Sequence, residues 1–177
     1  MQGLIIRKAD ISDIDTVTEL EKSCFPVPEA ADRNAFELRL KNYPECFWLL
    51  ERDGQIISMI NGMTTNCNDL CDEMYSGTDM YSPEGKWLML FGVATTPAYQ
   101  KRSFTSQLME RVIEDTKKQG RRGIVLTCKE ELLPFYSRFG FVSEGISDSE
   151  HGGAKWYQMR LKLINVMRRH NGDIVSH

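Results

Sequence analysis

Apolar side chains recur along the chain with two different spacings, which predict an alternation of helices and strands. Ile14, Val17 and Leu20 share one helical face, so the pattern predicts a helix over residues 13–24 with Ser12 as its N-terminal cap. Similar stripes predict further helices, and runs rich in large apolar residues predict strands. The further helices are expected over residues 35–41, 106–119 and 130–139. Strands are expected over residues 4–9, 86–96, 123–128, 140–145 and 155–163.

Two segments between these elements carry signals of their own. Asp53 and Gly54 separate two β-rich runs, residues 46–52 and 55–64, which predicts a hairpin with a tight turn. Residues 65–85 are rich in Asn, Asp, Ser and Gly and predict a long loop of the kind that binds ligands or covers a site. Strands and helices in this order predict an α/β or α+β fold with a mixed sheet and helices on both faces.

Composition narrows the class of protein. The chain has 177 residues, of which 41% are hydrophobic and 27% charged, which is typical of a globular domain. We expect one domain over residues 1–163 and a C-terminal tail over residues 164–177. The net charge of −3 and the absence of a basic stripe argue against a nucleic-acid partner. The longest apolar run, WLMLFGVA, is too short to span a membrane.

The cysteines and the first residues of the chain bear on its compartment. Five cysteines without a tight framework fit a reducing environment, and MQGLIIRKAD lacks the features of a signal peptide. We therefore expect a cytoplasmic protein. Cys67 and Cys71 have a spacing that a metal site could use, but zinc sites need further Cys or His pairs that the sequence lacks, so no metal is expected.

The junction FGVATTPAYQKRSFTSQL is the first segment that suggests chemistry. Gly92, inside a predicted buried strand, is typical of a bulge or of a close approach to the backbone. The strand then leads directly into a helix, whose first N–H groups can bind phosphate, and Lys101 and Arg102 add positive charge there. A plain strand–helix turn with two solvated cations explains the same residues equally well.

The second such segment is LPFYSRFGF, residues 133–141, which has four aromatic rings in nine residues. Dense aromatics usually pack in a core, and Tyr136 brings a hydroxyl among them. The segment follows the next predicted strand, and adjacent parallel strands would place it at the same edge of the sheet as the first segment.

Both segments resemble motifs of one enzyme superfamily. VATTPAYQKRSFTSQL resembles the acetyl-CoA pyrophosphate motif of the GNAT N-acetyltransferases. LTCKEELLPFYSRFGF is similar to the strand–helix motif that follows it, most closely in arylalkylamine (serotonin) N-acetyltransferases and their bacterial relatives. The order of elements matches over residues 4–163. The resemblance implies a GNAT-like mixed, mostly antiparallel sheet that is split at a central V-shaped cleft.

The resemblance also implies roles for individual residues. Phe91 and Val93, beside a bulge near Gly92, would pair with the pantetheine arm of acetyl-CoA as cosubstrate, and Tyr136 would give a proton to its departing sulfur. Six residues would lie around the pyrophosphate: Gln100, Lys101, Arg102, Ser103, Phe104 and Thr105. A phenol with a pKa of ~10 can protonate a thiolate at modest cost. The neighbouring phenylalanines are expected to be core residues.

The sequence departs from the family pattern at two places. Ser103 and Thr105 replace small residues of the pyrophosphate motif; a positive φ at either would cost about 1–2 kcal/mol, and the Ser103 hydroxyl could compensate by capping the helix or binding phosphate. We therefore expect weakened acetyl-CoA binding. Trp87 and Met89 replace two histidines that the animal enzymes carry, and neither side chain can accept a proton.

The base and the acceptor site are less defined. Glu21, Glu29 and Glu73 could anchor a water chain that takes the proton, and His151 could be the base, an acceptor contact or a surface residue. The acidic side chains near them favour a cationic amine, or they form a solvated face. They are Glu29, Asp32, Asp69, Asp72, Glu73 and Asp79.

The leading functional hypothesis is transfer of acetyl from acetyl-CoA to a small primary amine by direct attack in a ternary complex. Cys128 is expected to be a buried thiol rather than an acetyl carrier. A non-catalytic acyl-CoA-binding module and a protein Lys or N-terminal acetyltransferase are the alternatives. A homodimer is left open.

Overall fold

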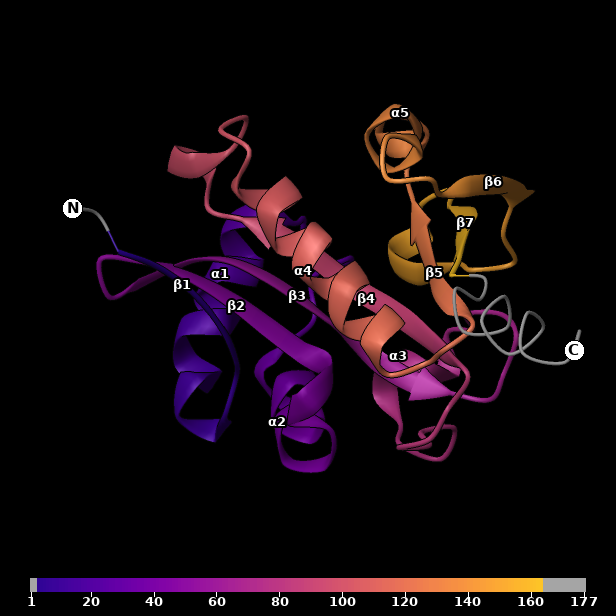
Figure 1. Cartoon of the computed structure of the whole chain (residues 1–177), viewed down its shortest axis with the longest axis horizontal. Helices are drawn as coiled ribbons and strands as arrows, with labels where there is room; N and C mark the ends of the chain where they lie inside the picture. Colours follow the sequence, from indigo (N-terminus) through magenta and orange to yellow (C-terminus); the bar gives the residue numbers. More distant parts are fainter. Residues whose placement is uncertain (1–2, 164–177) are drawn as a thin grey trace, which may run out of the picture.

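Seven strands form one mixed sheet in the computed structural model, which describes residues 3–163; the predicted tail at 164–177 lies outside the described residues. The order across the sheet is β1-β2-β3-β4-β5-β7-β6 (Figure 1). Of these neighbours, β4 and β5 run parallel and the others antiparallel. The strands are β1 (Leu4–Lys8), β2 (Phe47–Arg52), β3 (Gln55–Thr65), β4 (Trp87–Thr95), β5 (Gly123–Cys128), β6 (Val142–Ile146) and β7 (Tyr157–Lys162).

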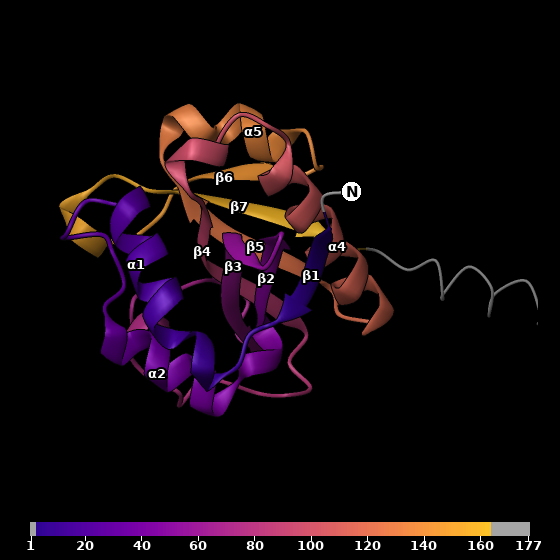
Figure 2. The same cartoon turned by 90° about the vertical axis from the view of Figure 1, so that its left-hand side faces the viewer.

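Helices cover both faces of this sheet, as the sequence predicts. Figure 2 shows α1 and α2 on one side and α4 on the other. The α-helices are α1 (Ile14–Cys24), α2 (Arg33–Asn42), α3 (Glu73–Ser76), α4 (Phe104–Lys118) and α5 (Leu133–Ser137). Short 3-10 turns occupy Ile11–Asp13, Pro44–Cys46, Pro97–Tyr99, Glu130–Leu132 and His151–Gly153. No helix in the described part of the chain has the length and apolar character needed to cross a membrane.

Three local predictions are corrected. Asp10 rather than Ser12 caps the first helical segment, because its carboxylate accepts the Ser12 N–H at 2.8 Å. The helix predicted over residues 130–139 is a 3-10 turn followed by the single turn of α5. The predicted loop at 65–85 contains α3, a one-turn helix with no apolar stripe long enough to be detected.

Alternation along β2 divides the core between the two faces of the sheet. Phe47 and Leu49 pack with α1 and α2, whereas Trp48 and Leu50 belong to the cluster that includes α4. Successive side chains of a strand point to opposite faces, so a strand covered on both sides is apolar throughout. The central sheet is thus fixed from both faces.

The sheet opens between its two parallel strands. Pairing of β4 with β5 runs from Trp87–Gly123 to Leu90–Leu126 and stops there, so the strands separate from Phe91 onward, one residue earlier than the expected Gly92. On the other side of β4, Asn61 pairs with Gly92 and Gly62 pairs with Leu90, which leaves Phe91 as the extra residue of the expected bulge. Figure 1 shows β4 and β5 close at one end and apart at the other.

Gly62 lets the two backbones approach at this bulge. A Cβ at Gly62 would lie 1.9 Å from the carbonyl oxygen of Met89. We expect Gly62→Ala to lower the free energy of unfolding by about 3 kcal/mol, because the strands must move apart to admit the methyl group. Denaturant unfolding measures this change.

Gly3→Ala is the matched control, since a Cβ there meets no atom within 4 Å. It should change stability by about 0.5 kcal/mol or less. Equal stability of the Gly62→Ala and Gly3→Ala proteins would contradict the assignment of Gly62 to a close backbone contact.

Candidate active site

A pocket lies where β4 and β5 separate, and we call it the cleft pocket. It is lined by side chains and backbone from both walls of the cleft, among them Glu21, Gly92, Val93, Thr127, Cys128 and Tyr136. Unpaired strand backbone and convergent polar side chains are typical of a binding site.

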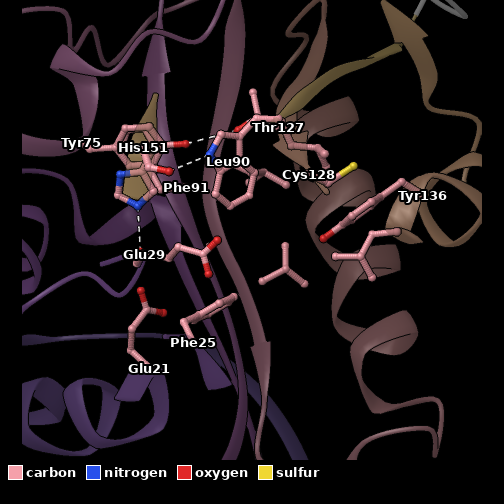
Figure 3. Close-up of a pocket in the computed structure, with 15 residues that line it drawn as sticks. Glu21, Phe25, Glu29, Tyr75, Leu90, Phe91, Thr127, Cys128, Tyr136 and His151 are labelled. Atoms are coloured by element: carbon pink, nitrogen blue, oxygen red, sulfur yellow. Dashed lines mark hydrogen bonds between the residues drawn. The ribbon is translucent and has the colours of Figure 1, made fainter. Parts of the chain in front are cut away.

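Tyr136 forms part of one wall. The ring is 6% exposed and packs edge to face on Phe135 and Phe141, with centroids 5.0 and 5.9 Å away. Figure 3 shows its hydroxyl pointing into the cleft pocket. Burial raises the pKa of this phenol above the ordinary value that the sequence analysis assumes. The hydroxyl therefore loses its proton less readily than an exposed tyrosine does.

The other aromatic residues of this segment pack as the sequence suggests, with one refinement. Phe141 is buried, whereas Phe135 and Phe139 are only partly buried and stack edge to face at 5.3 Å. Phe135 and Phe139 therefore support the position of Tyr136 from the outer side of the core.

Glu21 of α1 faces the cleft from the opposite side. One carboxylate oxygen, Oε2, accepts the Ala31 N–H at 2.8 Å. The other, Oε1, is buried without a hydrogen-bond partner among the described residues and lies 3.7 Å from the position that a Cβ would take at Gly92. Burial raises the pKa of this carboxyl, and the positive charge of Arg39 opposes the shift. A buried carboxylate with one unpartnered oxygen at a pocket is suited to accept a proton.

Glu29 contacts residues on both sides of the cleft. Its Oε1 is 2.7 Å from Nζ of Lys129, which follows β5, and its backbone carbonyl accepts a hydrogen bond from Nε2 of His151 at 2.7 Å. Its other carboxylate oxygen, Oε2, is buried without a hydrogen-bond partner within residues 3–163. We call the contact of Glu29 with Lys129 and His151 the roof.

His151 is held on the cleft by a folded loop. Its ring stacks on Tyr75 at 4.7 Å, and its carbonyl accepts the Trp156 indole N–H at 2.7 Å. Gly152 has a φ of 64°, and a Cβ there would lie 2.6 Å from Cγ of Glu29, so glycine lets the loop approach. The loop therefore places His151 at the cleft pocket, and its contact with an acceptor stays a prediction.

Tyr75 of α3 is a site residue that the sequence reasoning missed. Its hydroxyl lies 3.4 Å from Oγ1 of Thr127 on β5, and its ring packs on Phe91 at 4.9 Å. Burial raises its pKa. Tyr75 is one of two tyrosines in the polar segment 65–85, and the sequence gives no indication of which strands it contacts.

A second hollow leads from Tyr136 to the turn between β4 and α4, and we call it the arm channel. Its walls include Cys24, Val93, Thr95, Gln100, Thr105 and Tyr136. Gln100 donates to the Thr95 carbonyl at 3.0 Å, and the Thr95 and Thr105 hydroxyls are 2.5 Å apart. The arm channel therefore joins the predicted pyrophosphate turn to the predicted proton donor.

The turn itself has the backbone shape of an anion site. Lys101 and Ser103 have φ values of 60° and 66°, and α4 begins directly after them. Left-handed residues in such a turn direct successive N–H groups to one side, where an anion can bind. A positive φ is expected from the sequence at Ser103 or Thr105. The structure has it at Ser103 and also at Lys101, while Thr105 lies inside α4.

The side chains of this turn correct one further expectation. The Ser103 hydroxyl does not cap α4; it accepts a hydrogen bond from Nε2 of Gln107 at 3.3 Å. Lys101 and Arg102 are exposed, and the Arg102 guanidinium lies 5.4 Å from the Tyr99 ring. The Phe104 side chain is buried against Tyr99, and the expected contact of its backbone N–H with the pyrophosphate stays a prediction.

Glu73 is the predicted site residue that the structure places elsewhere. It is exposed on α3 and borders a separate hollow with Asp69 and Glu144, outside the cleft pocket. The helical turn of α3 directs Tyr75, not Glu73, to the cleft. Trp87 and Met89, at the positions of the family's histidines, are both buried in the core.

Solved structures of other proteins share this fold. The loading GNATL domain of CurA from Lyngbya majuscula has a TM-score of 0.78 at 16% identity, with 91% of this chain and 98% of that chain covered. The GphF GNAT-like decarboxylase in complex with isobutyryl-CoA has a TM-score of 0.77 at 22% identity, with 90% and 100% covered. At sequence identities this low, the comparisons show a shared fold and no more.

One curated relative and one family model match the sequence itself. The probable hydrolase YhcX of Bacillus subtilis strain 168 is 23% identical over 144 residues, which are 77% of this chain but 27% of that protein. The model of the acetyltransferase (GNAT) family matches residues 14–141, more than half of the chain. The chain therefore belongs to the GNAT family of acetyltransferases.

Proposed function

We propose that the protein transfers the acetyl group of acetyl-CoA to a primary amine by direct attack in a ternary complex. One observation carries the proposal: the Tyr136 hydroxyl and the unpartnered Oε1 of Glu21 face the same pocket from opposite walls (Figure 3). The family membership supplies the class of reaction, and these two groups supply an acid and a base. The likeness to arylalkylamine N-acetyltransferases remains a prediction.

The arm channel and the turn that follows β4 fit acetyl-CoA. The pyrophosphate would bind at the N–H groups of the turn between Lys101 and Thr105, with the two cations nearby. The pantetheine arm would lie along β4 at Phe91–Val93, where β5 no longer pairs with it. The thioester sulfur would then lie beside Tyr136, at the junction of the arm channel and the cleft pocket.

The reaction can be written with its protons balanced. The amine nitrogen bonds to the thioester carbonyl carbon, Glu21 takes the ammonium proton, the C–S bond breaks, and the sulfur leaves with the bonding electrons. The raised pKa of Tyr136 keeps the phenol protonated, so it donates a hydrogen bond to the developing thiolate rather than titrating beforehand. The thiolate takes its proton from the Tyr136 hydroxyl, and the phenolate regains one from solvent, to which Glu21 releases the proton that it took from the amine.

Cys128 supports direct transfer over a covalent acyl-enzyme. It is 2% exposed, and burial raises the pKa of its thiol to about 11. The thiolate is the nucleophilic form, and it is scarce at neutral pH with such a pKa. The acetyl group therefore has no activated cysteine to reside on within the cleft pocket.

The roof favours a small acceptor over an extended peptide. Glu29 contacts Lys129 and His151 across the top of the cleft, so an extended chain could not lie through it without breaking the 2.7 Å ion pair. A pure acyl-CoA-binding module is less consistent with the site, because binding alone needs no buried carboxylate at the acetyl end.

A second candidate function is decarboxylation of a 2-carboxyacyl-CoA. The Thr127 and Tyr75 hydroxyls lie 3.4 Å apart on the cleft, and His151 stacks on Tyr75, so several donors could stabilise an enolate oxygen. The GNAT-like decarboxylase GphF shares the fold. The buried Glu21 and Glu29 carboxylates repel a carboxylate substrate, which ranks this candidate second. Release of CO₂ from malonyl-CoA without any amine would favour it.

Replacing Tyr136 by Phe tests the acid. We expect kcat to fall by about 100-fold while the dissociation constant of CoA changes by about twofold or less, because the hydroxyl acts on charge that develops only during C–S cleavage. Thiol release from acetyl-CoA with a panel of small amines gives kcat, and calorimetric titration with CoA gives the affinity.

Tyr157→Phe is the matched control, because it removes a phenol from β7 outside the cleft pocket. It should retain wild-type turnover. A Tyr136→Phe enzyme as fast as the Tyr157→Phe enzyme would remove the acid from the mechanism.

The pH dependence tests the base. Burial raises the pKa of Glu21 above its ordinary 4.5, so the carboxylate needed as base forms only at higher pH than for an exposed glutamate. At a fixed concentration of unprotonated amine, kcat/KM should rise with pH through that raised pKa and level off above it. Glu21→Gln should lower kcat/KM by about 100-fold and abolish this limb.

Glu19→Gln, on the exposed side of the same helix, is the control and should keep the limb. An unchanged acid limb in the Glu21→Gln enzyme would assign the titration to another group.

A further inference from the structure

The cleft pocket has a second opening, on the side away from the arm channel, which we call the side passage. It shares Glu21, Glu29, Tyr75, Phe91 and His151 with the cleft pocket. Farther out it is bordered by Asp32, Asp72 and three small residues at positions 30, 31 and 35. A ligand in this passage reaches the acetyl end of the cleft without entering the arm channel.

The inner end of the side passage presents two carboxylate oxygens without hydrogen-bond partners. Oε1 of Glu21 and Oε2 of Glu29 are both buried and have no hydrogen-bond partner in the described part of the chain. The whole residues are 5% and 9% exposed. Buried carboxylate oxygens without partners are costly, and an ammonium group with three N–H donors satisfies them.

The outer end carries two further carboxylates. Asp32 accepts the Ala35 N–H at the start of α2, and Asp72 accepts the Ser149 hydroxyl and the Glu150 N–H. These donors are neutral and add no positive charge beside either carboxylate. Neither aspartate has an ion-pair partner among residues 3–163.

Two cations oppose these four carboxylates. Lys129 is bound to Oε1 of Glu29, and Arg39 is buried with its guanidinium over the Phe91 ring, donating to Asn61 Oδ1 and the Tyr75 carbonyl. Four carboxylates and two cations leave two negative charges along the passage. The faces of Tyr75 and Phe91 between the two ends suit an alkyl chain or a cation.

We propose that the acceptor is a linear diamine with two ammonium groups. One ammonium group lies at Glu21 and Glu29 and passes a proton through Glu21 to solvent before its nitrogen attacks the thioester. The distal ammonium lies between Asp32 and Asp72 at the outer end. This inference rests on the proposed amine acetylation and names its substrate class. Amino acids are disfavoured, because their carboxylate would enter a passage with excess negative charge.

The experiment compares 1,5-diaminopentane with pentylamine as acceptors in the thiol-release assay. We expect kcat/KM to be about tenfold or more higher for the diamine, since the chain length is equal and only the second charge differs. The preference should shrink in 0.5 M salt, where the Debye length falls to about 4 Å.

Asp32→Asn isolates the outer carboxylate. Asparagine caps helices as well as aspartate does, so α2 should keep its start while the charge is lost. We expect the diamine-to-pentylamine ratio of kcat/KM to fall about fivefold, with a further fall in Asp32→Asn/Asp72→Asn. Glu19→Gln removes the same charge from the outer face of α1 and should keep the wild-type ratio.

The outcomes separate this inference from the proposed function. If no amine releases thiol from acetyl-CoA, the proposed function itself fails. If both amines react equally, or if the ratio survives both aspartate substitutions, acetyl transfer to amines stands and the diamine assignment is overturned. A ratio that falls only in the aspartate variants supports the assignment.

Discussion

The parallel pairing between β4 and β5 ends after Leu90 and Leu126, and every feature of the candidate site depends on that end. Beyond it, β4 pairs only with β3, while β5 continues along β7 to Cys128. The extra residue Phe91 turns β4 away, and Gly62 provides the space that this bend needs. The resulting opening exposes strand backbone in the middle of a sheet, which a folded domain otherwise avoids.

Buried polar groups around this opening lower the stability of the folded chain. Carboxylate oxygens of Glu21 and Glu29, Nε of Arg39 and Nδ2 of Asn61 are buried without a hydrogen-bond partner within the described residues. Each such group costs about 1–3 kcal/mol. Of the five such groups in the described residues, these four lie around the opening, where a bound ligand can supply partners, and the fifth is the Tyr43 hydroxyl in the core. Burial at this opening also raises the pKa of Glu21, against the lowering effects of the Ala31 N–H and the Arg39 charge, and so affects the pH at which its carboxylate forms.

Much of the fold could be predicted because it is encoded locally. The Asp53-Gly54 turn, the stripe of α4 and the apolar runs of β4 and β5 are short-range patterns, and the structure has all of them. Asp10 caps the first helical segment instead of the predicted Ser12, because two polar residues near the helix start can each fill this role. The family resemblance identified the cleft and the position of Tyr136, which residue patterns alone left undecided.

The rest of the site could not be read from the sequence, because it depends on contacts between distant segments. His151 and Glu29 are 122 positions apart, and Tyr75 and Thr127 are 52 apart. Tyr75 reaches the cleft only because α3 forms a single turn, which also turns Glu73 away from it. Nothing in the chain between these residues indicates that they meet.

The arm channel and the side passage have no lining residue in common and meet only at the cleft pocket. Two molecules can therefore arrive from different directions without either blocking the other. A compulsory order of binding would require one ligand to create the other's entrance, and this architecture supplies both entrances in advance. For the proposed transfer, this architecture predicts a random-order mechanism in which each product departs by the route its precursor used.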